Sequence, residues 1–93
     1  MRLSESERNR FAAEHPEWDL EGEEIERTYE FDGFPSAVAF VTECAFAAEQ
    51  ADHHPDIDIR WNKVTMTLTT HSESALTARD TDLAARFDSI AGS

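Results

Sequence analysis

The 93-residue chain contains few residues of several kinds, and each shortage excludes a class of protein. Cys44 is the only cysteine, so an intramolecular disulfide and a metal site with several cysteine ligands are excluded. The three glycines are all separated, which leaves no glycine-rich phosphate loop. No apolar run approaches the roughly 18 residues of a membrane-spanning helix, and no signal-peptide pattern opens the chain. We therefore expect a cytoplasmic protein without disulfides and with no membrane partner.

Basic residues are scarce as well. Eight basic side chains, of which only Lys63 is a lysine, stand against 20 acidic ones, and the formal net charge is −12. Binding to phosphates requires a basic patch, so no nucleic-acid partner is expected. Carboxylate repulsion is screened at high salt, where the Debye length falls to about 3 Å at 1 M. Two interpretations stay open: a halophile-like adaptation to a salt-rich cytoplasm, or an ordinary acidic protein.

Hydrophobic residues make up 40% of the chain, enough for one small core, so we expect a single domain over residues 1–93. Residues 1–14 read as an amphipathic helix that ends before Pro16. Residues 24–31 alternate as a half-buried strand, with Arg27 as an exception on its apolar face. The side chains expected to point inward from these two elements are Leu3, Phe11, Ala12, Ile25, Tyr29 and Phe31.

Residues 35–50 change to helical spacing and predict a helix with one broad apolar face. That face comprises Ala37, Val38, Phe40, Val41, Cys44, Ala45 and Ala48. Two more alternating segments, residues 57–61 and 64–70, predict strands, and the second carries threonines and His71 on the face opposite the core. A last helix is indicated by Leu76, Leu83, Phe87 and Ile90, after Thr77 and Asp80 in the spacing of a capping box.

Strands joined by short links favour an antiparallel sheet, and the apolar faces of the helices must cover one side of it. The predicted fold class is therefore α+β, with the helices packed on one face of the sheet and the other face open. The element order is α-β-β-α-β-β-α, in which the first strand is the least defined.

Histidines are the main candidates for chemistry, since an imidazole with its usual pKa of about 6.5 exchanges protons in both directions. His53 and His54 follow the long helix directly, and His71 ends the threonine-rich strand. The nearest acids are Glu49, one turn before His53, and Asp80 in the last helix. Structural interpretations stay open for each, because histidines before a proline often end a helix and Asp80 is placed to cap one.

A metal site is a further alternative, because three histidines and a carboxylate can bind zinc or iron. The proline after His54 favours an extended backbone, in which neighbouring side chains point to opposite sides. His53 and His54 are therefore not expected to converge on one ion, and we predict no metal.

Four motifs occur in order: residues 49–55 (EQADHHP), 61–64 (WNKV), 69–71 (TTH) and 76–80 (LTARD), with Trp18 and the turn at residues 31–34 upstream. Their combination closely resembles the pterin-4a-carbinolamine dehydratase family, over roughly residues 8 to 91. The resemblance implies a four-stranded antiparallel sheet with helices on one side. It also implies dehydration of 4a-hydroxytetrahydropterin to quinonoid dihydropterin, without a metal or bound cofactor, and assembly as a homodimer or homotetramer.

The resemblance carries over to six positions of this chain. His53, His54 and His71 match the catalytic histidines, and Glu49, Asp80 and Trp18 match positions that bind substrate or support the site. Two positions depart from the family: Ser74-Ala75 replaces the usual glycine-containing pair, and Trp61 replaces a tyrosine. Without glycine the loop after His71 has a more restricted backbone, so its shape is expected to differ.

The positions of the three histidines in the sequence predict different roles for them. His53 and His71 come from different elements and are assigned as the acid and base that approach a flat substrate from separate sides. His54 is assigned to binding. The alternatives are a non-catalytic pterin-binding protein, a role in molybdenum cofactor metabolism, and an oligomerising adaptor.

Overall fold

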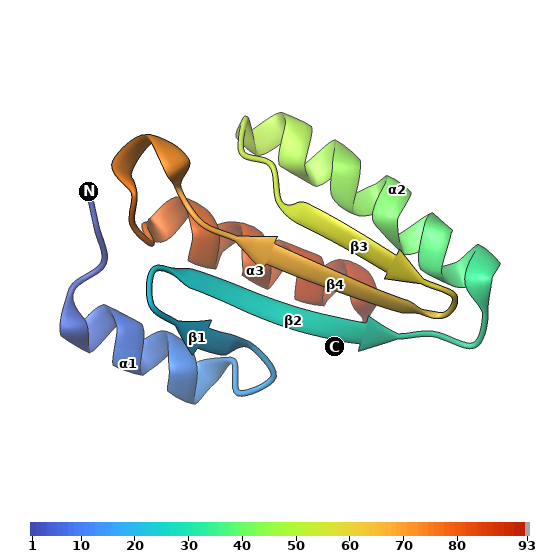
Figure 1. Ribbon diagram of the computed structural model, residues 1–93, viewed down its shortest axis with the longest axis horizontal. Helices are drawn as coiled ribbons and strands as arrows, with labels where there is room; N and C mark the ends of the chain where they lie inside the picture. Colours follow the sequence, from blue (N-terminus) through green and yellow to red (C-terminus); the bar gives the residue numbers. More distant parts are fainter. Residues whose placement is uncertain (93) are drawn as a thin grey trace.

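The computed structural model describes residues 1–92 and consists of one four-stranded antiparallel sheet with helices on one face. The elements are α1 (Glu5–Glu14), β1 (Asp19–Glu21), β2 (Glu24–Glu30), α2 (Phe34–Ala51), β3 (Asp56–Arg60), β4 (Lys63–Leu68), the 3-10 turn η1 (His71–Glu73) and α3 (Ala78–Ala91). The strand order is β1-β2-β4-β3, and Figure 1 shows β2 and β4 passing in front of α3 while α2 runs alongside β3. The predicted fold class and element order are confirmed.

The two central strands build the core by strict alternation. Ile25 lies opposite Leu68, and Tyr29 lies opposite Val64, and all four side chains are buried against the helices. Side chains of successive residues in a strand point to opposite faces, so this register sends every second residue of β2 and β4 to the open face. The predicted alternation in both strands is confirmed.

The open face of the sheet is acidic. In the pairing of β1 with β2, Asp19 lies opposite Glu26 and Glu21 lies opposite Glu24. Carboxylates placed directly opposite each other on neighbouring strands repel. The structure therefore concentrates part of the net charge on one surface.

The helices differ from the prediction in which residues they bury. Ser4 caps α1, which begins at Glu5, and Ala12 is exposed rather than facing inward. Along α2, Val38 and Ala45 are exposed, so the single broad apolar face is wrong for these two residues. A helix packed on a sheet buries one stripe of its surface, and the rest of its circumference stays outside even when apolar. None of the helices within residues 1–92 combines the length and apolar character needed to cross a membrane.

The hairpin of β3 and β4 also ends differently from the prediction. Arg60 pairs with Lys63, so Trp61 and Asn62 form the two-residue turn and Trp61 is no strand residue. The backbone of Trp61 has φ 54, in the left-handed region, and its side chain is 70% exposed. The Asn62 amide donates to the Phe31 carbonyl at 2.9 Å. This bond ties the tip of the hairpin to the segment after β2.

Candidate active site

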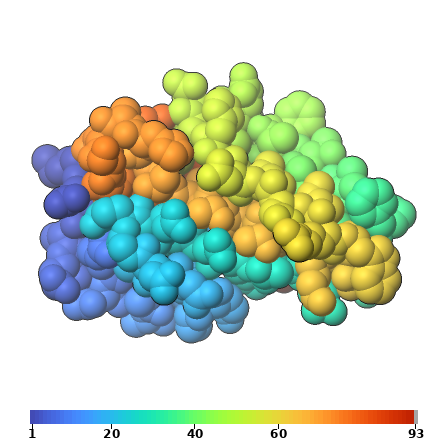
Figure 2. All heavy atoms as spheres, in the orientation of Figure 1, coloured from blue at the N-terminus to red at the C-terminus, as the bar shows by residue number. Residues whose placement is uncertain are grey.

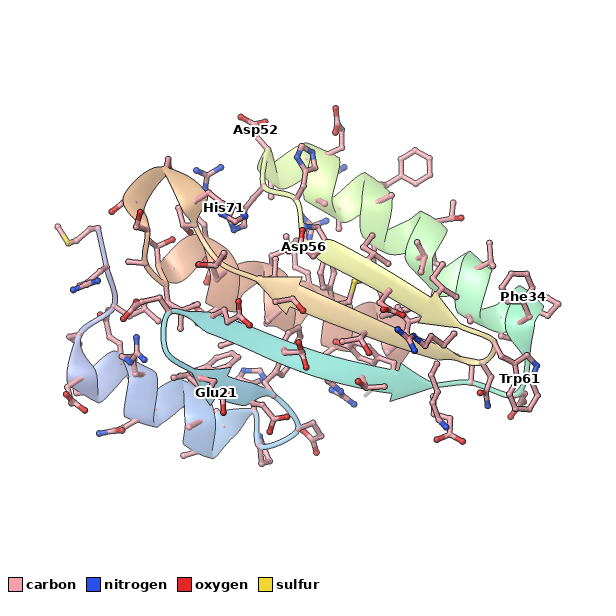
Figure 3. The ribbon with its side chains drawn as sticks, viewed as in Figure 1. Glu21, Phe34, Asp52, Asp56, Trp61 and His71 are labelled. Carbon is pink, nitrogen blue, oxygen red and sulfur yellow. The ribbon has the colours of Figure 1, made fainter. Side chains whose placement is uncertain are left out.

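The three predicted histidines meet at one cavity of about 250 Å3, where the end of α2, the end of β4 and the start of α3 come together. Its lining residues are Asp52, His53, His54, Thr69, Thr70, His71, Ser72 and Arg79. In the space-filling view the η1 segment lies directly beside the end of α2 (Figure 2). Figure 3 shows His71 directed into the region between η1 and Asp52.

This cavity is distinguished from the others by its chemistry and not by its size. A larger one, of about 310 Å3, lies between α1 and α3 and contains a single histidine, His15. Only the smaller cavity combines three imidazoles drawn from two separate elements.

The end of α2 places His53. Asp52 adopts the left-handed conformation (φ 50, ψ 46), and its N–H donates to the last carbonyls of the helix. The next N–H, that of His53, donates to the Ala48 carbonyl at 3.1 Å. Two consecutive bonds of this kind end a helix sharply. Aspartate tolerates the left-handed conformation better than most residues do. The chain therefore leaves α2 at a fixed point, immediately before the two histidines.

The His53 imidazole is held by Asp80. Its Nε2 lies 2.5 Å from Asp80 Oδ1, and both side chains are buried, with exposed fractions of 8% for His53 and 0% for Asp80. A carboxylate only accepts hydrogen bonds, so Nε2 is the donor and Nδ1 is left for proton exchange. Orienting an imidazole and setting its tautomer is the common role of a carboxylate partner.

Asp80 also has the capping role that its sequence position suggested. Its Oδ2 accepts from the Thr77 N–H at 3.0 Å and from the Thr70 hydroxyl at 2.8 Å. The Thr77 hydroxyl accepts in turn from the backbone, which completes a capping box at the start of α3. Asp80 therefore caps α3 and binds the His53 imidazole at the same time.

The His54 imidazole has a carboxylate partner of its own, separate from that of His53. Its Nε2 lies 3.1 Å from Glu49 Oε1, and both side chains are exposed. An exposed pair of this kind contributes little to stability, so Glu49 orients His54 only loosely.

The loop that carries His71 contains a residue other than glycine in the left-handed conformation. Ser74 has φ 50 and ψ 39, and Ala75 is buried and forms backbone bonds with Thr70 in both directions. An L-residue in this conformation costs roughly 1–2 kcal/mol. Serine therefore holds a strained position directly after η1, and His71 itself is exposed at the rim of the cavity.

Trp18 does not line this cavity. Its buried indole N–H donates to Asp88, which also accepts from Tyr29 at 2.6 Å and from Arg27 at 2.7 Å. His15 lies 3.3 Å from the same carboxylate. This Asp88 cluster was not predicted, although Arg27 on an apolar strand face was a signal for a buried acidic partner. Trp18 thus binds Asp88, which lies about two turns beyond Asp80 on α3, and has no place in the lining of the histidine cavity.

Cys44 is buried and poorly suited to act as a nucleophile. Burial, with a smaller effect of Glu43, raises the pKa of the Cys44 thiol to about 12, so the thiolate is disfavoured. Within residues 1–92 no three His, Cys, Asp or Glu side chains are grouped so that they could hold a metal ion. What the cavity offers is proton transfer by imidazoles, one of them oriented by a buried carboxylate.

Comparisons with known proteins identify the family of the chain. The family model described as pterin 4 alpha carbinolamine dehydratase matches residues 1–90. A Chloroflexus aurantiacus protein named "Putative pterin-4-alpha-carbinolamine dehydratase" is 54% identical over 98% of this chain and 98% of its own length. The chain belongs to the pterin-4a-carbinolamine dehydratase family.

Two solved structures share the fold. A Brucella melitensis protein described as a transcriptional coactivator/pterin dehydratase superposes with a TM-score of 0.92 at 36% identity, over 98% of this chain and 99% of its own. A pterin dehydratase-like protein described as a RuBisCO assembly factor in the alpha-carboxysome has a TM-score of 0.68 at 23% identity, over 82% of this chain and 88% of its own. The second similarity extends to the fold alone.

Proposed function

We propose that the protein dehydrates pterin-4a-carbinolamine, that is 4a-hydroxytetrahydropterin, to quinonoid dihydropterin by general acid–base catalysis, as a step in tetrahydropterin recycling. The observation that carries the proposal is the buried His53–Asp80 pair at a cavity that also holds His71 and His54. The family supports the substrate class, and the imidazoles support the acid–base chemistry.

The reaction needs one proton donor and one proton acceptor. The acid protonates the hydroxyl on C4a, the C–O bond breaks and water leaves. The base removes the proton from the adjacent ring nitrogen, and the electrons of that N–H bond form the new carbon–nitrogen double bond. Each proton transfer is worth about 10²–10⁴-fold when the group is well placed.

We assign the transfers to His53 and His71, which belong to different elements, and substrate binding to His54. Turnover of His53→Ala and of His71→Ala is expected to fall by about 10²-fold or more with little change in KM. For His54→Ala the expected effect is mainly a higher KM. Loss of turnover in His54→Ala, with turnover kept in His71→Ala, would reverse these roles.

The activity itself is tested with a synthetic 4a-carbinolamine and metal-free protein. We expect faster dehydration than in buffer, and the same rate in the presence of a chelator. The variant lacking all three histidines is the control, and circular dichroism confirms its fold. A rate that chelator abolishes and zinc restores would favour the metal mechanism instead.

We further infer that the protein forms a homodimer or homotetramer. Phe34 and Val38 lie four residues apart on α2, and Phe46 lies eight residues beyond Val38; all three are exposed, Phe46 to 70%. At about 100° of rotation per residue the three fall within roughly a third of the helix circumference, a face that we call the outer stripe. The half-exposed Ile57 and Ile59 of edge strand β3 add to the exposed apolar surface. Burying these side chains between copies would remove them from water.

Sedimentation of the native protein and of Phe46→Ser tests the assembly. The native protein is expected to sediment as a dimer or tetramer, and the variant as a smaller species. The outer stripe also supports the second candidate function, that of an adaptor for another protein. Assembly and partner binding without turnover, and turnover no different in the triple-histidine variant, would favour that function over the enzyme.

A further inference from the structure

Within residues 1–92, Arg79 is the only lysine or arginine side chain that lines the histidine cavity. It is the second residue of α3, where a positive charge is unfavourable because the amino end of a helix carries partial positive charge. A contact outside α3 can offset this unfavourable interaction with the helix dipole. The structure provides one: Arg79 Nη2 donates to the Asp52 carbonyl at 2.5 Å.

This bond caps α2 from a neighbouring helix. The last carbonyls of a helix lack partners within it, and an arginine side chain is well suited to bind them. Here the bound carbonyl belongs to the peptide that joins Asp52 to His53. The orientation of that peptide sets the direction in which the His53 side chain leaves the backbone. Asp80, the neighbour of Arg79, holds the imidazole of the same residue.

We propose that Arg79 is a positioning residue that holds the turn bearing His53 and His54 through the Asp52 carbonyl. Two adjacent residues of α3 thus fix the two ends of His53, Arg79 its backbone and Asp80 its ring. His54 depends on the turn more strongly, since its only side-chain partner within the described residues is the exposed Glu49. The inference rests on the proposed dehydratase activity for its kinetic consequence, although its structural consequence does not.

The test compares Arg79→Met with Arg86→Met. Arg86 makes the same kind of link from α3 to α2, to Ala47 and Gln50, but lies about two turns farther along and outside the cavity. A displacement of about 1 Å in catalytic groups can cost up to about 10²-fold. For Arg79→Met we expect kcat to fall about 10-fold, with KM within about 2-fold and the pH–rate profile unmoved. Arg86→Met is expected to keep the native kcat.

Hydrogen exchange measured by NMR gives a readout that needs no turnover. The His53 N–H, bonded to the Ala48 carbonyl, is expected to exchange about 10-fold faster in Arg79→Met than in the native protein, and no faster in Arg86→Met. An inactive native protein would end the dehydratase proposal, and the exchange rates would then decide the positioning role alone.

Five outcomes overturn the inference. Unchanged His53 exchange in Arg79→Met would show that the bond does not hold the turn. Unchanged kcat in an active protein would show that holding the turn does not position the histidines. A raised KM with native kcat would make Arg79 a substrate-binding residue. A shifted pH–rate profile would mean that its charge, and not its hydrogen bond, affects the histidines. An equal loss in Arg86→Met would reduce both arginines to general stabilisation of the helix pair.

Discussion

Replacing Asp80 by asparagine changes the hydrogen bonding of His53 without removing the side chain. The asparagine oxygen can still accept from Thr70 and from the Thr77 N–H, as Asp80 Oδ2 does now. The amide nitrogen then faces His53 Nε2, which must accept instead of donate. The imidazole is held in the opposite tautomer, with its proton on Nδ1. We expect turnover to fall by about 10²–10⁴-fold, the range found when a catalytic histidine loses its proper partner.

The cost in stability is smaller for asparagine than for alanine. Asparagine keeps the cap but loses charge-assisted bonds, which we put at about 1–2 kcal/mol. Alanine leaves the His53 Nε2–H and the Thr77 N–H without a partner, at about 1–3 kcal/mol each, while the Thr70 hydroxyl keeps its bond to the Thr77 hydroxyl. Asp80→Ala is therefore expected to lose roughly 3 kcal/mol or more, a large part of the 5–15 kcal/mol typical of a small domain. Each kcal/mol corresponds to about 4–8 °C in Tm for a domain of this size.

The assay is kcat at a temperature where circular dichroism shows every variant folded. Asp88→Asn is the matched control, since Asp88 is also a buried aspartate of α3 with several donors, and it lies outside the histidine cavity. The Asp88→Asn substitution is expected to lower Tm and to leave kcat unchanged. Native turnover in folded Asp80→Asn would refute the role of the carboxylate in setting the tautomer. Equal losses in both variants would show that kcat follows stability alone.

Three further predictions concern the rest of the molecule. The melting temperature is expected to rise as salt is raised from about 0.1 M to several molar, because carboxylate repulsion is screened. Glu24→Gln removes the repulsion with Glu21 and is expected to stabilise the protein by about 0.5 kcal/mol at low salt only. A Tm that is already maximal at low salt would contradict this. The buried Cys44 has a pKa of about 12 against an ordinary value of 9.0, so the folded state holds a proton that the unfolded state loses. The unfolding free energy should therefore be fully retained below about pH 9 and decline toward pH 12, and thiol reagents at pH 8 should label Cys44 only as fast as the chain unfolds; rapid labelling of folded protein contradicts this. Tyr29→Phe removes a bond to Asp88 and is expected to cost about 1.5–3 kcal/mol in urea unfolding, with kcat retained; a cost below the error of the measurement would show that the bond is not needed.

Local patterns predicted the elements well because their causes are local. Alternation in β2 and β4 reports directly which side chains face the helices, and both strands follow it. The capping box at Thr77 and Asp80 involves residues three apart, so the start of α3 was visible in the sequence. At Trp61 the alternation did not predict the structure. Trp61 continues the alternation of Ile57 and Ile59, but the chain turns at this residue and Arg60 pairs with Lys63.

Contacts between distant segments were accessible only in part. The histidine motifs named the residues that meet at the cavity, but nothing local indicated that Arg79 binds the Asp52 carbonyl, 27 residues away. The Asp88 cluster had one visible sign, Arg27 among apolar neighbours, and no sign of which acid would pair with it. Hydropathy alone also could not divide the apolar residues of α2 into a buried stripe and the outer stripe. That division depends on which side of the helix packs against the rest of the protein.

Stability and chemistry share their hydrogen bonds at this site. Asp80 is kept in place by the start of α3, where N–H groups without helical partners favour a carboxylate. The same carboxylate receives the His53 imidazole. The end of α2, where carbonyls lack partners, lies across the cavity and receives Arg79. The start of α3 and the end of α2 are thus both satisfied by side chains of α3, and the two that do so, Asp80 and Arg79, are those that we propose orient His53. Removing either contact leaves a helix end unsatisfied as well as a catalytic group displaced, which is why substitutions that keep the cap, such as Asp80→Asn, are needed to measure the chemical role separately.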